Sequence, residues 1–379
     1  MNPPRLRILM FGYLPPPVFG PSVSYQALMR SEFARHFEVT FINLSVVNSV
    51  HELEVFRIGK LLKFAGFAGR ELGHLLRRRF DFCCYPISLS KNAFLKDALL
   101  LQLARAFAVP TVIYAQGTGL GAFREKLSPR MQGLFDATIR NAAGAIVMAE
   151  ALRSDFDGLL PADRVFVVWH GIEPAGWPFP DRKNRASLTM LSLGLLRREK
   201  GTFDLLKAMP LVLAKRPEIK LVLAGQWWRP DQQSDAEIFI RENNLAGSVK
   251  FVGPVAGATK WQQLCDADIF VFPSHTRAEA FGMVLLEAMQ AGLPIVATRG
   301  GARSEMIADG VNGLLAADQD PADLAAKILQ LADDDALRER MAQANREKFA
   351  REFTHEQYGR RMIGAFETLA ARGRQRTTR

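Results

Sequence analysis

The strongest constraint on the fold is the repeated alternation of short, continuous apolar runs with longer segments of helical periodicity. The apolar runs are residues 7–11, 39–43, 80–85, 111–115, 145–149 and 165–169 in the first half, and 188–193, 219–225, 249–253, 269–273 and 294–298 in the second. Continuous apolar strands are typical of parallel sheets that helices cover on both faces. Two such series predict an α/β chain with two doubly wound domains that face each other across an interdomain cleft.

The boundary between the two series is a segment rich in proline, glycine and charge, "GIEPAGWPFPDRKNRAS" at 171–187. This composition indicates a linker, and 379 residues suffice for two separate cores. We predict an N-terminal domain over 1–175, a linker over 176–187 and a C-terminal domain over 188–354. A C-terminal helix and a basic tail then occupy 355–379, and the sequence leaves open whether that helix packs back on the N-terminal domain.

Cysteine content and hydropathy predict a chain in the reducing cytoplasm. Cys83 and Cys84 are adjacent and Cys265 is distant, which is neither a disulfide framework nor a metal-ligand spacing. No run of 18 apolar residues predicts a membrane-spanning helix, and the first residues lack the apolar core of a signal peptide.

The net charge of +10 is concentrated in two places, residues 57–79 and the arginine-rich C-terminal tail. Such patches suit an anionic partner, which can be a membrane surface, a nucleotide diphosphate or nucleic acid, although a solvated face explains them equally well. Apolar residues recur at helical spacing within 57–79. The segment is therefore either an interfacial helix on anionic lipid or a core-packed helix pair with basic outer faces, and its glycines weaken a single continuous helix.

The loop after the first strand carries Gly20, followed by Ser22 as a candidate cap for a helix that begins near Val23. In parallel sheets, ligands bind beyond the carboxyl ends of the strands. A glycine ahead of a helix N-terminus lets the backbone approach an anion, although a purely structural turn has the same pattern. The loop after 188–193 carries Arg197, Arg198 and Lys200. Three cations there can hold a diphosphate leaving group.

Two glutamates, Glu279 and Glu287, flank Phe281-Gly282 after the strand at 269–273. Eight positions along a helix correspond to a rotation of about 80°, so two helical glutamates would not share a face. We therefore predict that Glu279 lies on a loop and Glu287 in the following helix, with both carboxylates directed into one site. Carboxylates accept hydrogen bonds from paired sugar hydroxyls, and free N–H groups near Gly282 suit an oxygen-rich ligand.

Several patterns that suggest a metal site are better explained as structural. D-x-D occurs four times, at 155–157, 266–268, 318–320 and 333–335, and a pattern with only two fixed positions recurs easily. Asp266 and Asp268 precede a strand, at the wrong end for the cleft. We expect no metal, and we interpret His170 and His275 as turn histidines with structural partners.

The order of motifs in the second half resembles glycosyltransferase family 4, a family of retaining, nucleotide-sugar-dependent enzymes with two Rossmann-like domains in the GT-B arrangement. The motifs are "GLLRREKG", "LVLAG", "VKFVGPV", "DADIFVFPS", "EAFGMVLLEAMQAGLPIVAT" and "DGVNGLL". The resemblance is dense over 188–350 and looser over 1–180, where "PPPVFGPS" and "HGIE" are similar to family loops.

The resemblance implies a role for each matching residue. It places Glu287 on the ribose hydroxyls, Glu279 near the donor sugar, the backbone of Phe281 and Gly282 against that sugar, Lys200 on the diphosphate and Gly20 in a loop over the phosphates. It also implies transfer from a nucleotide diphosphate sugar to a glycan or lipid-linked acceptor, in bacterial surface polysaccharide synthesis at the cytoplasmic face of the inner membrane. It implies no cofactor, no metal and no nucleic acid partner.

Two positions depart from the family pattern. Leu195 stands where the family usually has arginine, and Gln116 stands where it tends to have histidine after the fourth strand. Gln116 can hydrogen-bond a sugar hydroxyl but cannot take up a proton. These two residues leave open a catalytically weak scaffold that binds nucleotide sugar. A sugar-nucleotide epimerase, an enzyme class that shares the fold, is a second alternative.

Overall fold

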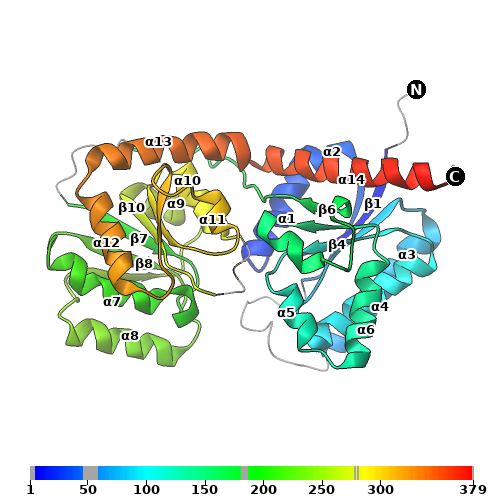
Figure 1. Cartoon of the computed structure of the whole chain (residues 1–379), viewed down its shortest axis with the longest axis horizontal. Helices are drawn as coiled ribbons and strands as arrows, with labels where there is room; N and C mark the ends of the chain where they lie inside the picture. Colours follow the sequence, from blue (N-terminus) through cyan, green and yellow to red (C-terminus); the bar gives the residue numbers. More distant parts are fainter. Residues whose placement is uncertain (1–4, 46–58, 181–186, 277–278, 280, 378–379) are drawn as a thin grey trace. The chain divides into compact units, whose positions relative to one another are not determined.

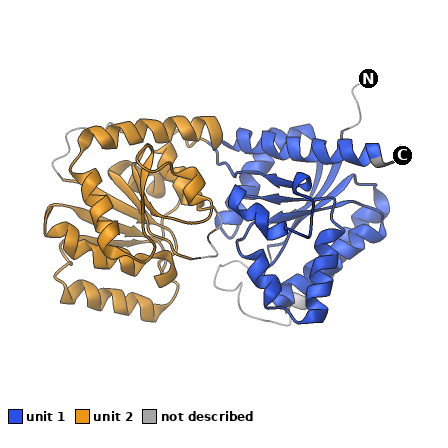
Figure 2. Ribbon diagram, viewed as in Figure 1, with its two compact units in different colours: residues 1–173, 353–379 blue, residues 174–352 orange. Residues whose placement is uncertain are grey.

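The computed structural model describes residues 5–45, 59–180, 187–276, 279 and 281–377, and the chain divides into two compact units (Figures 1 and 2). Unit 1 comprises residues 1–173 together with 353–379, and unit 2 comprises residues 174–352. The C-terminal segment therefore belongs to the first unit. Part of the segment interpreted as a linker, 181–186, lies outside the described residues.

Unit 1 is a parallel sheet of six strands in the order β2-β1-β3-β4-β5-β6. Its strands are β1 (Arg7–Gly12), β2 (Glu38–Asn43), β3 (Phe82–Pro86), β4 (Thr111–Ala115), β5 (Gly144–Val147) and β6 (Val165–Val167). Its α-helices are α1 (Gly20–Arg30), α2 (Glu32–His36), α3 (Gly59–Arg77), α4 (Lys91–Ala106), α5 (Leu120–Glu125), α6 (Pro129–Arg140) and α14 (His355–Thr377). Helices α1, α2 and α14 cover one face of this sheet, and α3, α4 and α6 cover the other (Figure 1).

Unit 2 is a second parallel sheet of six strands, in the order β12-β11-β10-β7-β8-β9. Its strands are β7 (Thr189–Leu193), β8 (Lys220–Ala224), β9 (Val249–Gly253), β10 (Ile269–Phe272), β11 (Ile295–Thr298) and β12 (Gly313–Ala316). Its α-helices are α7 (Thr202–Leu213), α8 (Pro230–Glu242), α9 (Gly257–Asp266), α10 (Met283–Gln290), α11 (Arg303–Met306), α12 (Pro321–Ala332) and α13 (Asp335–Glu352).

Both sheets have the doubly wound topology that the continuous apolar runs predicted. Every residue of β3, β4, β10 and β11 is buried, as expected for strands that helices cover on both faces. The fold class is therefore confirmed. Strand β12 has no counterpart among the predicted strands, because only four residues form it and the first of them is Gly313, with Gly310 shortly before.

The first helix differs from its prediction in one detail. It begins at Gly20 rather than near Val23, and Phe19 occupies the N-cap position. Ser22 therefore lies inside the first turn, where its Oγ accepts a hydrogen bond from the Phe19 backbone N–H at 3.0 Å. Its hydroxyl also lies 2.8 Å from the Pro17 carbonyl oxygen and fastens the proline-rich loop to the helix.

Candidate functional site

The candidate site lies at the carboxyl edge of the unit 2 sheet, where β7 and β10 are neighbours although they are not consecutive in the chain. The strand series builds outward from β7 in one direction and from β10 in the other. Adjacent loops at such a topological switch point part to opposite faces and leave room for a ligand. The loop after β7 carries Lys200, and the loop after β10 carries Glu279.

Backbone contacts hold three loops together at this edge. The His275 N–H, after β10, donates to the Glu199 carbonyl oxygen, after β7, at 3.1 Å. The Thr298 hydroxyl, at the end of β11, donates to the Ser274 carbonyl oxygen at 2.6 Å. The loops that follow β7, β10 and β11 therefore form one connected surface.

Gly201 makes the closest of these approaches possible. It caps α7 in the left-handed region with φ of 73°, and a Cβ atom at this position would overlap the Pro273 carbonyl group. Only glycine combines that conformation with that proximity at low cost. The residue thereby brings the β7 loop against the carboxyl end of β10.

Lys200 and Glu279 form an ion pair through Lys200 Nζ and Glu279 Oε2. Their side chains are only 26% and 14% exposed. Burial lowers the pKa of Lys200 to about 8, and the nearby cations Arg197 and Arg303 act in the same direction, whereas the pairing with Glu279 opposes it. An anionic ligand that took the place of Glu279 would find a partly desolvated cation already in position.

Glu287 lies inside α10 and Glu279 lies on the loop before it, as the spacing argument predicted. Lys260 of α9 donates to Glu287 Oε1 at 2.5 Å. The second oxygen, Oε2, has no hydrogen-bond partner among the described residues although it is buried. One carboxylate oxygen is therefore paired with a cation, and the other is an acceptor without a donor among the described residues.

The backbone around Gly282 is also suited to an oxygen-rich ligand. Gly282 is the N-cap of α10, with φ of 81° and no side-chain cap, and Phe281 before it is buried. The first N–H groups of a helix have no partner within it, so they can donate to a ligand.

The structure does not bring all three predicted cations together. Arg197 is close enough to affect the pKa of Lys200. Arg198 instead pairs with Asp235 of α8 at 2.5 Å and lies over the Phe203 ring at 3.9 Å. The role of Arg198 on a diphosphate stays a prediction, and its contacts do not support it.

In unit 1, the corresponding edge carries Gly20 after β1 and Gln116 after β4. Gln116 is half-buried, and its side-chain amide interacts with the Tyr114 hydroxyl. Behind it, the Tyr114 hydroxyl lies 2.7 Å from His170 Nε2 and 2.5 Å from the Tyr358 hydroxyl. Burial lowers the pKa of His170 to about 3, so its imidazole is neutral and serves the packing of β4 against α14.

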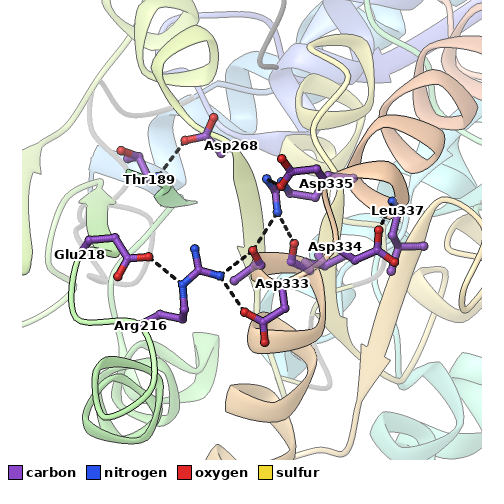
Figure 3. Close-up of polar contacts among 11 residues, drawn as sticks. Thr189, Arg216, Glu218, Asp268, Asp333, Asp334, Asp335 and Leu337 are labelled. Atoms are coloured by element: carbon purple, nitrogen blue, oxygen red, sulfur yellow. Dashed lines mark hydrogen bonds and ion pairs between the residues drawn. The ribbon is translucent and has the colours of Figure 1, made fainter. Parts of the chain in front are cut away.

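At least one aspartate of each D-x-D pattern has a structural partner. Asp268 accepts from the Thr189 backbone N–H at 2.8 Å, and Asp333 pairs with Arg216 at 2.6 Å (Figure 3). Asp155 accepts from the start of α5 and Asp320 caps α12. Among the described residues, no group of three or more His, Cys, Asp or Glu side chains is placed to hold a metal ion.

Comparison with known proteins identifies the family. The model for "Glycosyl transferases group 1" matches residues 177–348, which include every unit 2 residue discussed above. An uncharacterized glycosyltransferase of Methanocaldococcus jannaschii is 36% identical over 267 residues, which cover 70% of this chain and 71% of that protein. This chain belongs to the group 1 glycosyltransferases.

Other relatives of this group 1 glycosyltransferase carry the names of different activities. A glycogen synthase of Mycobacterium tuberculosis is 30% identical over 260 residues, which cover 67% of this chain but only 62% of that protein. A phosphatidyl-myo-inositol mannosyltransferase of Mycolicibacterium smegmatis is 32% identical over 211 residues, which cover 55% of this chain and 53% of that one. The chain thus spans about half to three fifths of these relatives.

Solved structures show that the fold of this glycosyltransferase is GT-B. Anabaena HepE in complex with UDP and glucose superposes with a TM-score of 0.72, at 17% identity over 96% of this chain and 100% of that one. Sucrose-phosphate synthase from Thermosynechococcus elongatus gives a TM-score of 0.73, at 18% identity over 97% and 100%.

The sequence motifs did not reveal Lys260. It lies in α9, after β9, and is separated from Glu287 by 27 positions. The only available signal was a basic residue beside Trp261 on a helix of otherwise uncharged early residues. The pairing with Glu287 depends on the tertiary structure, which brings Lys260 of α9 next to Glu287 of α10.

Proposed function

We propose that this chain is a retaining glycosyltransferase that moves a sugar from a nucleotide diphosphate donor to a hydroxyl of a glycan or lipid-linked acceptor. The observation that carries the proposal is the arrangement at the β7–β10 switch point. There, connected loops carry a largely buried lysine and a glutamate, and the following helix carries a second glutamate with one oxygen that has no partner among the described residues. Anabaena HepE, which has the same fold, forms a complex with UDP and glucose, and this supports a nucleotide sugar as donor.

Each group has a proposed task in the reaction. The bond between the sugar C1 and the diphosphate oxygen breaks, and Lys200 offsets the negative charge that develops on the leaving diphosphate. Glu287 accepts the ribose hydroxyls, and Glu279 accepts a hydroxyl of the donor sugar once Lys200 has turned to the phosphates. The acceptor oxygen bonds to C1 and its proton passes to the departing phosphate, so no protein base is required.

Gln116 fits this proposal because the mechanism needs no side chain at this position to take up a proton. Its amide can hold a hydroxyl of the donor sugar or of the acceptor. Relatives named for glycogen and for phosphatidyl-myo-inositol support a glycan or a lipid-linked acceptor, and bacterial surface polysaccharide synthesis is the setting we propose.

A panel of nucleotide diphosphate sugars, read by thermal unfolding, tests the donor. A donor at about 100 times its dissociation constant should add ~2.7 kcal/mol to the free energy of unfolding and raise the melting temperature. The stabilising donor is then incubated with glycan and lipid-linked acceptors, and the products are separated. Stabilisation with formation of an epimer and no transfer would instead identify an epimerase, and stabilisation with no turnover a scaffold.

We also propose that α3 and α4 contact an anionic membrane surface. Helix α3 is continuous from Gly59 to Arg77 despite its glycines, and the side chains described here begin at residue 65. Four leucines on the two helices are well exposed, and Leu76 and Leu99 are 68% and 57% exposed. The same two helices carry exposed basic side chains, namely Arg70, Arg77, Lys91 and Lys96. No described helix is long and apolar enough to cross a membrane.

Vesicle sedimentation tests this surface. The double variant Leu76→Ser, Leu99→Ser should bind vesicles that contain anionic lipid roughly tenfold more weakly, because less apolar area enters the interface. Binding of the unmodified chain should fall as salt is raised, because salt screens the basic residues. Leu211→Ser, an exposed leucine of α7 in unit 2, is the matched control. If the double variant binds vesicles as strongly as Leu211→Ser does, the exposed leucines of α3 and α4 do not contact the membrane.

A further inference from the structure

Arg303 is a buried cation without a carboxylate partner among the described residues. It opens the short helix α11 and is 4% exposed. Its Nε donates to the Thr298 carbonyl oxygen at 3.0 Å, and its Nη2 donates to the Arg299 carbonyl oxygen at 3.1 Å. The remaining nitrogen, Nη1, is buried and has no acceptor among the described residues. A buried charge is costly unless an anion balances it.

The surroundings of Arg303 are shaped for a guanidinium. Gly300 has φ of 128°, and a Cβ atom there would lie 2.8 Å from Arg303 Nη2. A larger residue at position 300 would therefore displace the guanidinium. Burial lowers the pKa of Arg303 and Asp318 acts on it in the opposite direction, but arginine keeps its charge in proteins.

Arg303 also lies at the edge where the other site residues gather. It follows β11, the neighbour of β10, and the Thr298 hydroxyl that precedes it bonds to Ser274 of the β10 loop. Its charge is among those that lower the pKa of Lys200. Two cations from different loops, one after β7 and one after β11, thus act on the same small region.

We propose that Arg303 binds the diphosphate of the donor, and that it supplies from the β11 side the guanidinium that Leu195 does not supply from the β7 side. Leu195 is half-buried in the β7 loop and has no polar group to offer. The inference rests on the proposed function, because it requires a nucleotide diphosphate donor. Nη1 is closed to solvent in the ligand-free chain. Binding of a diphosphate at Nη1 therefore requires a local rearrangement that exposes this nitrogen.

A structural role is the competing explanation. The two hydrogen bonds from Arg303 to backbone carbonyl oxygens also hold the turn after β11 in place. If that is its only role, Arg303 contributes to the stability of the fold and not to ligand binding. The two roles differ in what a substitution changes. Loss of a clamp lowers the melting temperature of the ligand-free chain, whereas loss of a diphosphate contact lowers affinity for any ligand that carries two phosphates.

The test compares Arg303→Met and Arg303→Lys with the unmodified chain, and uses inorganic pyrophosphate and a panel of nucleoside diphosphates as probes in calorimetry. Arg303→Met should weaken binding of pyrophosphate and of the preferred nucleoside diphosphate by about tenfold to a hundredfold, as expected for one charged hydrogen-bonding group. Binding of the matching nucleoside, which has no phosphate, should not change. Arg299→Ala is the matched control, because Arg299 is exposed and pairs with Asp309.

Rescue makes the test specific. Leu195→Arg, added to Arg303→Met, should restore part of the lost pyrophosphate affinity. If Arg303→Met folds poorly, Arg303→Lys keeps a charge and one carbonyl contact, and its affinity should still fall. Unchanged pyrophosphate and nucleoside diphosphate affinity in folded variants would overturn the role of Arg303 and leave the donor proposal standing. Failure of the unmodified chain to bind either probe would overturn both.

Discussion

Replacement of Lys200 by alanine is expected to lower turnover by about 100- to 1000-fold, the loss seen when one preorganised donor to a developing negative charge is removed. Lys200 is the predicted cation that the structure places in contact with a site carboxylate, and it is largely desolvated. Its effect should appear mainly in kcat, because the leaving diphosphate gains charge in the transition state.

The melting temperature of the variant distinguishes chemistry from folding. Glu279 loses its partner, but its neighbours on the connected loops include other cations, so we expect a small change in stability. Lys207→Ala, an exposed lysine of α7, controls for removal of a lysine close by in sequence. A sharp drop in melting temperature, with normal turnover by the protein that stays folded, would show that the loop is structural.

Glu287→Gln is expected to weaken affinity for the free nucleotide diphosphate as well as for the whole donor, by about tenfold to a hundredfold for one hydrogen-bonded carboxylate. The amide keeps the shape of the side chain but places an NH2 group either towards Lys260 or at the open position of Oε2. An NH2 group facing the Lys260 ammonium would oppose two donors, so the amide oxygen faces Lys260. The NH2 group then replaces the acceptor that a ribose hydroxyl would use.

Calorimetry with the nucleoside diphosphate that emerges from the panel measures this change. Glu242→Gln, at the exposed end of α8, controls for the general effect of removing one negative charge from unit 2. Lys260 is 23% exposed and can reach solvent when its partner is lost, so the fold should survive. Unchanged nucleotide affinity in Glu287→Gln would contradict the assignment of this residue to the ribose.

The sequence by itself determined the fold class and indicated where along the chain the candidate site lies. Continuous apolar runs predict parallel strands because both faces of such strands must be buried. Polar residues after those strands mark a site because the carboxyl ends of parallel strands share one edge. Spacing alone also placed Glu279 on a loop and Glu287 in a helix, since a helix cannot present both on one face.

Only the tertiary structure decided which side chains meet. Lys260 pairs with Glu287, 27 positions away, and Arg303 lies close enough to Lys200 to lower its pKa. Arg198 pairs with Asp235 instead of pointing to the candidate site. Local pattern cannot predict such pairings, because the direction of a long side chain depends on which charges the packing of helices and loops brings within reach. Packing also explains why one oxygen of Glu287 and one nitrogen of Arg303 have no hydrogen-bond partner among the described residues. Both atoms are buried away from water, and no described residue provides a hydrogen bond in its place.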